Sequence, residues 1–196
     1  MIILGLTGSI GMGKSTLARM LGRLGCALHD SDECVHQALE PTGAGFEKVA
    51  LSFPESWDKK KHLIKRDVLA QIIFNDDVQR RKLENILHPI VKQNQKIFIQ
   101  KQKRLGTKFV VLDIPLLFET GAEDRVDYTI VASAPYHIQR RRVLGRPNIS
   151  EENFLRILET QMPDAQKRMR ADFVVSTGMG MAYSFKQLRQ ILQELS

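Results

Sequence analysis

The chain has 196 residues, of which 43% are hydrophobic and 26% charged, so it is long enough for one globular domain with a substantial core. No apolar run approaches the roughly 20 residues that span a bilayer, and no basic segment with a cleavage site opens the chain, so we expect a cytoplasmic protein with no membrane partner. The formal net charge is +7, but no basic run alternates with aromatic residues, which favours a small phosphorylated ligand over nucleic acid.

The first predicted elements form a phosphate-binding unit. An apolar run at 2–6 is typical of a buried strand, helix-forming residues occupy 16–24, and Gly-Ser-Ile-Gly-Met-Gly-Lys-Ser lies between them at 8–15. This is the P-loop pattern, in which glycines let the backbone approach an anion, Lys14 adds a charge beside the phosphates and Ser15 ligates Mg²⁺. We therefore expect ATP or GTP with magnesium, rather than a glycine-rich turn that matches by chance. The expected nucleotide-binding residues are Gly11, Met12, Gly13, Lys14, Ser15 and Thr16.

A second short strand is predicted at 26–29, and it ends in Asp30-Ser31-Asp32. Ligands bind beyond the carboxyl ends of the strands in an open parallel sheet, so a carboxylate here faces the phosphate site. Asp30 or Ser31 also suits the N-cap of a helix predicted over 33–39. Because there are two aspartates and one cap position, we expect one aspartate to have a chemical role.

The middle of the chain is predicted to be helical, with elements over 46–53, 67–74 and about 77–104. The last of these carries regularly spaced apolar residues that include Ile97. We interpret residues 58–104 as a helical substrate-binding insertion. His88, within it, is either structural or functional.

Three further strands are predicted at 109–113, 126–132 and 173–175. The first of them ends in Asp113, which either orders magnesium and its waters or only makes a turn. An amphipathic helix over 185–195 follows the last strand. This order of elements predicts an α/β fold: a five-stranded parallel sheet flanked by helices, like that of P-loop nucleotide kinases, in a single domain over 1–196.

Two helices after the fourth strand form a candidate lid over 136–167. They are joined by the turn Arg146-Pro147-Asn148, and the second is expected to run from a cap at Ser150 to about Met169. The first carries consecutive arginines at 140–142. A solvated basic face is the alternative, but phosphoryl transfer needs cations near the developing charge, which favours a lid that closes over ATP.

A set of short motifs follows the P-loop in a characteristic order. The set comprises Asp30-Ser31-Asp32, Arg66 to Leu69, His88-Pro89, Pro115-Leu116-Leu117-Phe118-Glu119, Arg142, Arg146, Gln161, Lys167 and Ala171-Asp172. Together with the opening Leu-Thr-Gly-Ser-Ile-Gly-Met-Gly-Lys-Ser at 6–15, it resembles the dephospho-coenzyme A kinase family over nearly the whole chain. One departure is Ser176-Thr177-Gly178, where the family often has Asn-Asn-Gly.

The resemblance implies transfer of the ATP γ-phosphoryl group to the ribose 3′-hydroxyl of dephospho-coenzyme A, with Mg²⁺ as the metal. It implies that Asp32 accepts the hydroxyl proton and that Lys14 and Arg142 offset charge on the transferred group. Arg142 and Arg146 then belong to the nucleotide site. The implied substrate-binding residues are Asp32, Arg66, His88, Pro89, Leu116 and Glu119.

Two other classes of protein share part of this pattern. Another small-molecule kinase, for a nucleoside or shikimate, has a P-loop and a lid but lacks the Pro-Leu-Leu-Phe-Glu element. A GTP-dependent switch protein needs an Asn-Lys-x-Asp motif, which this sequence lacks. The sequence leaves the oligomeric state open.

Overall fold

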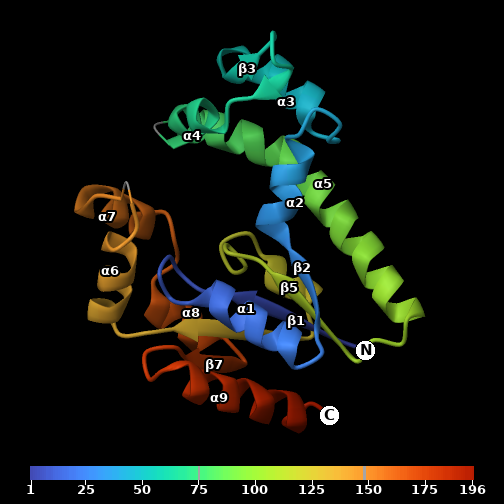
Figure 1. Cartoon of the computed structure of the whole chain (residues 1–196), viewed down its shortest axis with the longest axis vertical. Helices are drawn as coiled ribbons and strands as arrows, with labels where there is room; N and C mark the ends of the chain where they lie inside the picture. Colours follow the sequence, from blue (N-terminus) through green and yellow to red (C-terminus); the bar gives the residue numbers. More distant parts are fainter. Residues whose placement is uncertain (75, 148) are drawn as a thin grey trace. The chain divides into compact units, whose positions relative to one another are not determined.

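The computed structural model describes residues 1–74, 76–147 and 149–196. Their contacts divide the chain into two compact units, one formed by Met1–His29 with Gln102–Ser196 and the other by Asp30–Lys101 (Figure 1). Asn148, expected in the turn between the two arginine-bearing helices, lies outside the described residues. Among the described helices, none is both long enough and apolar enough to cross a membrane.

A five-stranded parallel sheet forms the centre of the first unit, as the sequence predicts. Its strands are β1 (Ile2–Thr7), β2 (Ala27–Asp30), β5 (Phe109–Asp113), β6 (Tyr128–Ser133) and β7 (Phe173–Ser176). They lie in the order β2-β5-β1-β6-β7, so β1 is central. Leu4 of β1 is in register with Val111 of β5 and with Tyr128 of β6. The apolar strand sequences follow from this position, because a parallel sheet is covered on both faces.

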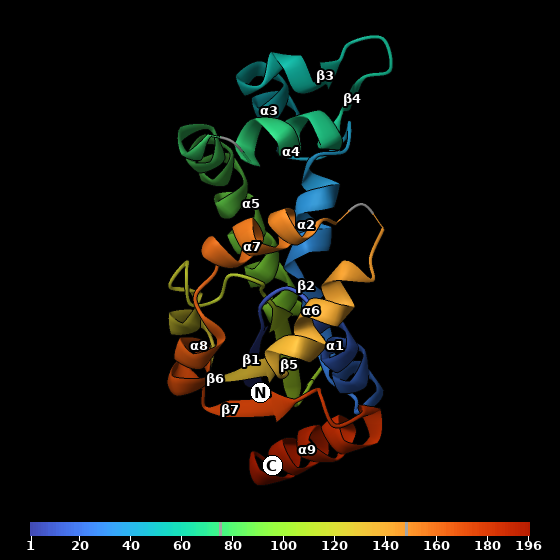
Figure 2. The same cartoon turned by 90° about the vertical axis from the view of Figure 1, so that its left-hand side faces the viewer.

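Helices α1 (Lys14–Arg23) and α9 (Met181–Glu194) pack against each other and against the sheet (Figures 1 and 2). Leu17 and Leu21 of α1 and Leu188 of α9 are fully buried in one apolar cluster with the strands. Cys26 belongs to the same cluster, and burial raises the pKa of its thiol to about 11, so the thiol is protonated and unreactive at neutral pH. This packing fixes the start of α1, and with it the end of the P-loop.

The segment after β6 differs from the sequence prediction in one respect. Helix α6 (Tyr136–Leu144) is as expected, and the Ser150 hydroxyl caps the next helix by accepting a hydrogen bond from the Asn153 N–H at 3.1 Å. That helix does not run on to Met169, however. It divides into α7 (Glu151–Glu159) and α8 (Asp164–Arg170), with Pro163 at the N-cap of α8. Proline lacks an N–H and disfavours helical geometry in the residue before it, which explains the break.

The second unit is mainly helical and has its own apolar cluster. Its elements are α2 (Ser31–Ala38), α3 (Phe46–Ser52), a short 3-10 helix (Pro54–Ser56), the hairpin strands β3 (Trp57–Asp58) and β4 (Leu63–Ile64), α4 (Arg66–Phe74) and α5 (Asp77–Arg104). Leu83 and Leu87 of α5 are buried in the cluster, but Ile97 is 57% exposed. Apolar spacing alone therefore overestimated how far the core extends along α5, since the cluster includes residues of this helix only as far as Ile90.

Candidate active site

The loop between β1 and α1 has the backbone geometry of an anion-binding turn. Gly11 and Gly13 have φ of 75° and 91°, in the left-handed region that favours glycine. A Cβ at Gly11 would lie 2.5 Å from Cγ2 of Val143 in α6, so the site also requires a residue without a side chain. Gly13 occupies the N-cap of α1 and offers no side chain to the first amides of the helix. Those N–H groups and the positive end of the helix dipole together favour a phosphate.

Lys14 is held by the acid at the end of the neighbouring strand. Its Nζ lies 2.6 Å from Oδ1 of Asp113, and the two side chains are only 15% and 7% exposed. Asp113 is placed there by the sheet register, which sets it beside Leu6 at the end of β1. The Asp113 carboxylate therefore faces the P-loop lysine, and its role in ordering magnesium stays a prediction.

Arg142 also contacts the P-loop, through a residue that the motif analysis did not assign. Its Nη1 and Nη2 donate to Oγ1 and O of Thr177, at 2.9 and 2.6 Å, and Nη1 lies 3.4 Å from the Gly11 carbonyl. The Thr177 hydroxyl in turn donates to the Met12 carbonyl at 2.7 Å. Thr177 lies just after β7, at the departure from the family's Asn-Asn-Gly, and no sequence motif marks it. Only the packing of that loop on the P-loop reveals its role.

The other arginines of the candidate lid have different surroundings. Arg146 is exposed. Arg140 pairs with Glu151, and this hydrogen bond raises the pKa of the guanidinium. Arg156 pairs with Glu152 one turn earlier on α7. The structure therefore brings Arg142 to the P-loop, while Arg140 and Arg156 are engaged in surface ion pairs.

Glu119 has an internal partner. Its Oε1 lies 2.9 Å from Nζ of Lys167, which is fully buried, and also accepts a hydrogen bond from the Met162 N–H at 2.8 Å. A buried lysine requires such a counter-charge, because an unpaired ammonium in the interior is very costly. Leu116, in the same motif, is half-buried, and its carbonyl accepts hydrogen bonds from Thr120. The carboxylate of this motif thus ties the segment after β5 to α8.

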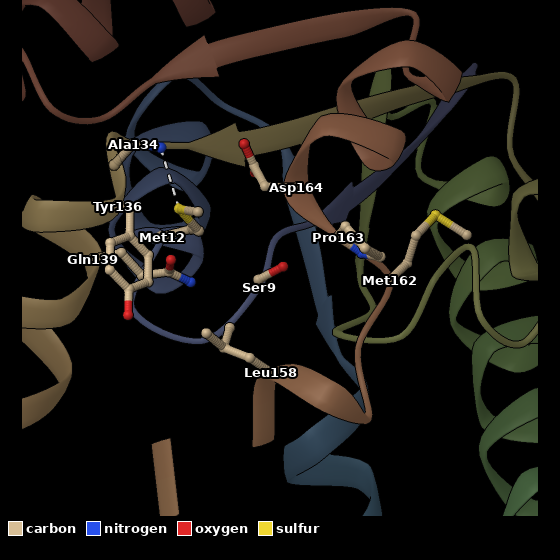
Figure 3. A pocket seen from close by; sticks show the side chains of 9 residues that line it. All are labelled: Ser9, Met12, Ala134, Tyr136, Gln139, Leu158, Met162, Pro163 and Asp164. Carbon is tan, nitrogen blue, oxygen red and sulfur yellow. Dashed lines mark hydrogen bonds between the residues drawn. The ribbon is translucent and has the colours of Figure 1, made fainter. Parts of the chain in front are cut away.

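A cavity of about 330 Å³ lies beside the P-loop (Figure 3). It is lined by Ser9, Met12, Ala134, Tyr136, Gln139, Leu158, Met162, Pro163 and Asp164. The Met12 side chain is buried, and its sulfur accepts a hydrogen bond from the Ala134 N–H at 3.2 Å. The Met12 backbone is engaged as well, since its N–H donates to the Ser9 carbonyl at 3.0 Å and its carbonyl accepts from Thr177.

The second unit contains the other residues singled out from the sequence. The Asp30 carboxylate caps α2 by accepting hydrogen bonds from the N–H groups of Asp32 and Glu33, at 2.9 and 3.1 Å. The cap interpretation is therefore right for Asp30, and Asp32 lies exposed in the first turn of α2. A buried glutamine of α5, Gln95, supports this turn by donating to Oγ of Ser31 at 3.1 Å. No motif or spacing in the sequence indicates that contact.

The acceptor-site candidates of the second unit lie on different helices. Arg66, at the start of α4, donates to the carbonyl of His36 in α2 at 3.1 Å, so the structure brings Arg66 to the helix that carries Asp32. His88 and Pro89 are exposed residues in the middle of α5.

Comparison with known proteins identifies relatives over the full length of the chain. The family model described as "Dephospho-CoA kinase" matches residues 2–182. A dephospho-CoA kinase from Agrobacterium fabrum is 44% identical over 200 residues, covering 100% of this chain and 98% of that protein. Among solved structures, the Thermus thermophilus protein TT1252 has a TM-score of 0.85 and 35% identity, covering 100% of this chain and 98% of that one. A dephospho-CoA kinase from Campylobacter jejuni has a TM-score of 0.71 and 28% identity, covering 99% and 96%.

The role of Thr177 is testable by removing only its hydroxyl. Thr177→Val keeps the shape of the side chain but leaves the Met12 carbonyl without its donor and removes one of the acceptors of Arg142, whose bond to the Thr177 carbonyl remains. We expect the free energy of unfolding, measured with urea, to fall by about 1–3 kcal/mol. Thr160→Val is the matched control, because the described hydrogen bond of that exposed hydroxyl runs to the nearby Ile157 carbonyl of α7, and we expect a change within about 0.5 kcal/mol. Equal losses in the two variants would contradict the assignment.

Proposed function

The chain belongs to the dephospho-CoA kinase family, and we propose that it transfers the γ-phosphoryl group of ATP to the ribose 3′-hydroxyl of dephospho-coenzyme A, the last step of coenzyme A biosynthesis. The proposal rests chiefly on the P-loop, where Lys14 begins α1 and Arg142 of α6 contacts the loop. The chain that contains it matches this family over its full length. A P-loop alone fits many kinases, whereas the full-length match favours this acceptor.

The nucleotide is assigned to the first unit. The loop and the first turn of α1, from Gly11 to Thr16, are assigned to the phosphates. The donors are the amides of Gly11, Gly13, Lys14 and Ser15, because the N–H groups of Met12 and Thr16 already donate to the Ser9 and Gly13 carbonyls, each at 3.0 Å. Lys14 and Arg142 supply the positive charge that phosphoryl transfer needs on the transferred group. Arg142 is well suited to this role, because its described hydrogen bonds run to neutral oxygens and leave its charge available to an anion.

The residues beside Lys14 also suit magnesium. The Ser15 hydroxyl is exposed one position after Lys14, and the Asp113 carboxylate lies against Lys14 itself. Hydroxyl and carboxylate oxygens are the ligands that Mg²⁺ takes in phosphoryl-transfer sites, where it is also held by the phosphates. Bound Mg²⁺ neutralises charge on the β- and γ-phosphate oxygens. We assign Ser15 to the metal and Asp113 to its ordering.

The acceptor is assigned to Asp32 and to the residues that the family motifs mark. Asp32 accepts the 3′-hydroxyl proton as the new bond to phosphorus forms. Arg66, His88 and Pro89 hold the acceptor in line with the γ-phosphate, and positioning of this kind supplies much of the rate enhancement. Leu116 and Glu119 shape the segment after β5. The ion pair between Glu119 and Lys167 supports a role in holding that segment in place.

Residues 136–167 are assigned as the lid, with the exposed Arg146 meeting the nucleotide on closure. Both substrates are small molecules, so the proposal involves neither nucleic acid nor a membrane, and the expected cytoplasmic location stays a prediction.

ATP consumption with a panel of acceptors tests the proposed function. We expect turnover with dephospho-coenzyme A and only background hydrolysis with adenosine or shikimate. Lys14→Ala should lower kcat/KM by about a hundredfold or more, because it removes a charge aimed at the transferred group. Lys186→Ala, at an exposed lysine of α9, is the control and should behave like the wild type. A higher kcat/KM with another acceptor than with dephospho-coenzyme A would contradict the substrate assignment.

A pair of matched substitutions distinguishes the base from the cap. Asp32→Asn keeps size and hydrogen bonding but removes the basic oxygen, so we expect kcat to fall about a hundredfold or more while the ATP dissociation constant changes little. Asp30→Asn should leave kcat and stability nearly unchanged, because asparagine caps a helix about as well as aspartate. If Asp30→Asn loses turnover and Asp32→Asn retains it, the two roles have been assigned the wrong way round.

A further inference from the structure

The peptide groups at Ile10, on the outer turn of the P-loop, are held from both sides by glutamine side chains. The Ile10 N–H donates to Oε1 of Gln161 at 3.0 Å. The Ile10 carbonyl accepts from Nε2 of Gln139 at 2.8 Å. The Ile10 N–H is therefore committed to the protein and is not one of the amides offered to a phosphate.

The two glutamines have complementary tasks. Gln139 lies in α6 and is buried, and here it acts as a donor. Gln161 is half-buried in the link between α7 and α8, and it acts as an acceptor. Because a glutamine amide carries both kinds of group, each orientation follows from the backbone atom that it meets.

Both glutamines belong to segments that are themselves held in place by close packing or by hydrogen bonds. α6 presses so closely on the P-loop that a Cβ at Gly11 would lie 3.0 Å from the Gln139 carbonyl, in addition to its clash with Val143. The link that carries Gln161 is held at the next residue, where the Met162 N–H donates to Glu119. The buried ion pair between Glu119 and Lys167 anchors that contact in turn. Gln139 and Met162 of this junction line the cavity in Figure 3, where they lie on opposite sides of Ser9.

We propose that Gln139 and Gln161 are positioning residues that hold the P-loop in its nucleotide-binding shape before ATP arrives. The proposal rests on the proposed function only in taking the P-loop as the ATP site. Because Gln139 and Gln161 fasten α6 and the α7–α8 link to one residue of the P-loop, they also fix both ends of the part of the candidate lid that lies between them. Movement of the candidate lid on ATP binding is then confined to the residues between Gln139 and Gln161.

Substitution by glutamate tests the donor and acceptor assignments against each other. Gln161→Glu keeps an oxygen for the Ile10 N–H, whereas Gln139→Glu sets a carboxylate against the Ile10 carbonyl and removes the donor. The two variants add the same charge beside the same residue, next to its N–H in one case and next to its carbonyl in the other. We therefore expect the ATP dissociation constant, measured without acceptor, to rise about tenfold or more in Gln139→Glu and about threefold or less in Gln161→Glu. Gln166→Glu, at an exposed residue of α8, is the charge control and should match the wild type.

Methionine variants of the two glutamines, together with the exchange rate of the Ile10 amide, test whether the two hydrogen bonds themselves hold the P-loop. Gln139→Met and Gln161→Met keep length but bond to neither Ile10 group, and both should raise the ATP dissociation constant about tenfold with the acceptor KM unchanged. The Ile10 amide should exchange slowly with solvent in the ligand-free wild type and faster in Gln161→Met, as measured by NMR. Since Gln161 is only half-buried, its variants keep the test available if those at Gln139 unfold.

Equal ATP affinities in the two glutamate variants would overturn the proposal, as would Ile10 exchange that is unchanged in Gln161→Met. Neither the ATP affinities of the glutamate variants nor the exchange of the Ile10 amide requires an acceptor. A chain that binds ATP as described but phosphorylates a different molecule would therefore refute the proposed function and leave this inference standing.

Discussion

A P-loop must turn backbone amides towards an anion, and this requirement organises the first unit. The groups of the loop that face away from the anion need partners within the protein, since an unsatisfied buried carbonyl or amide is costly. Gln139, Gln161 and Thr177 provide three such partners, for both groups of Ile10 and for the Met12 carbonyl. They come from α6, from the link after α7 and from the loop after β7. All three segments are thus held against the P-loop by hydrogen bonds to its backbone.

The charges of the site follow from the same arrangement. The central position of β1 puts the end of β5 next to the P-loop, so the carboxylate of Asp113 meets Lys14. Phosphate therefore approaches a lysine that already has an acidic neighbour. Arg142, by contrast, is oriented by the hydroxyl and carbonyl of Thr177 and by the Gly11 carbonyl, which direct the guanidinium without neutralising it. An oriented but uncompensated cation is well suited to charge that develops only during transfer.

Local sequence patterns predicted much of this structure, and the features that they missed have physical explanations. The strands, the P-loop and the Ser150 cap were predictable because period, glycine placement and capping chemistry act over a few residues. Thr177 and Gln139 were not predictable, since each reaches the P-loop through a hydrogen bond to a residue more than a hundred positions away. The family resemblance marked Glu119 and Lys167 but did not indicate that they pair with each other. Pro163 is a local signal that the predicted helix from Ser150 to about Met169 did not take into account.

The central claim is transfer of a phosphoryl group from ATP to one particular hydroxyl, and phosphorus NMR of the reaction mixture tests it most directly. With ATP, Mg²⁺ and dephospho-coenzyme A, the account predicts that a single new phosphomonoester signal grows at the same rate as ADP. That phosphorus should couple to the proton on the ribose 3′ carbon. A monoester coupled to the 2′ proton, or ADP released with inorganic phosphate and no new ester, would contradict the account.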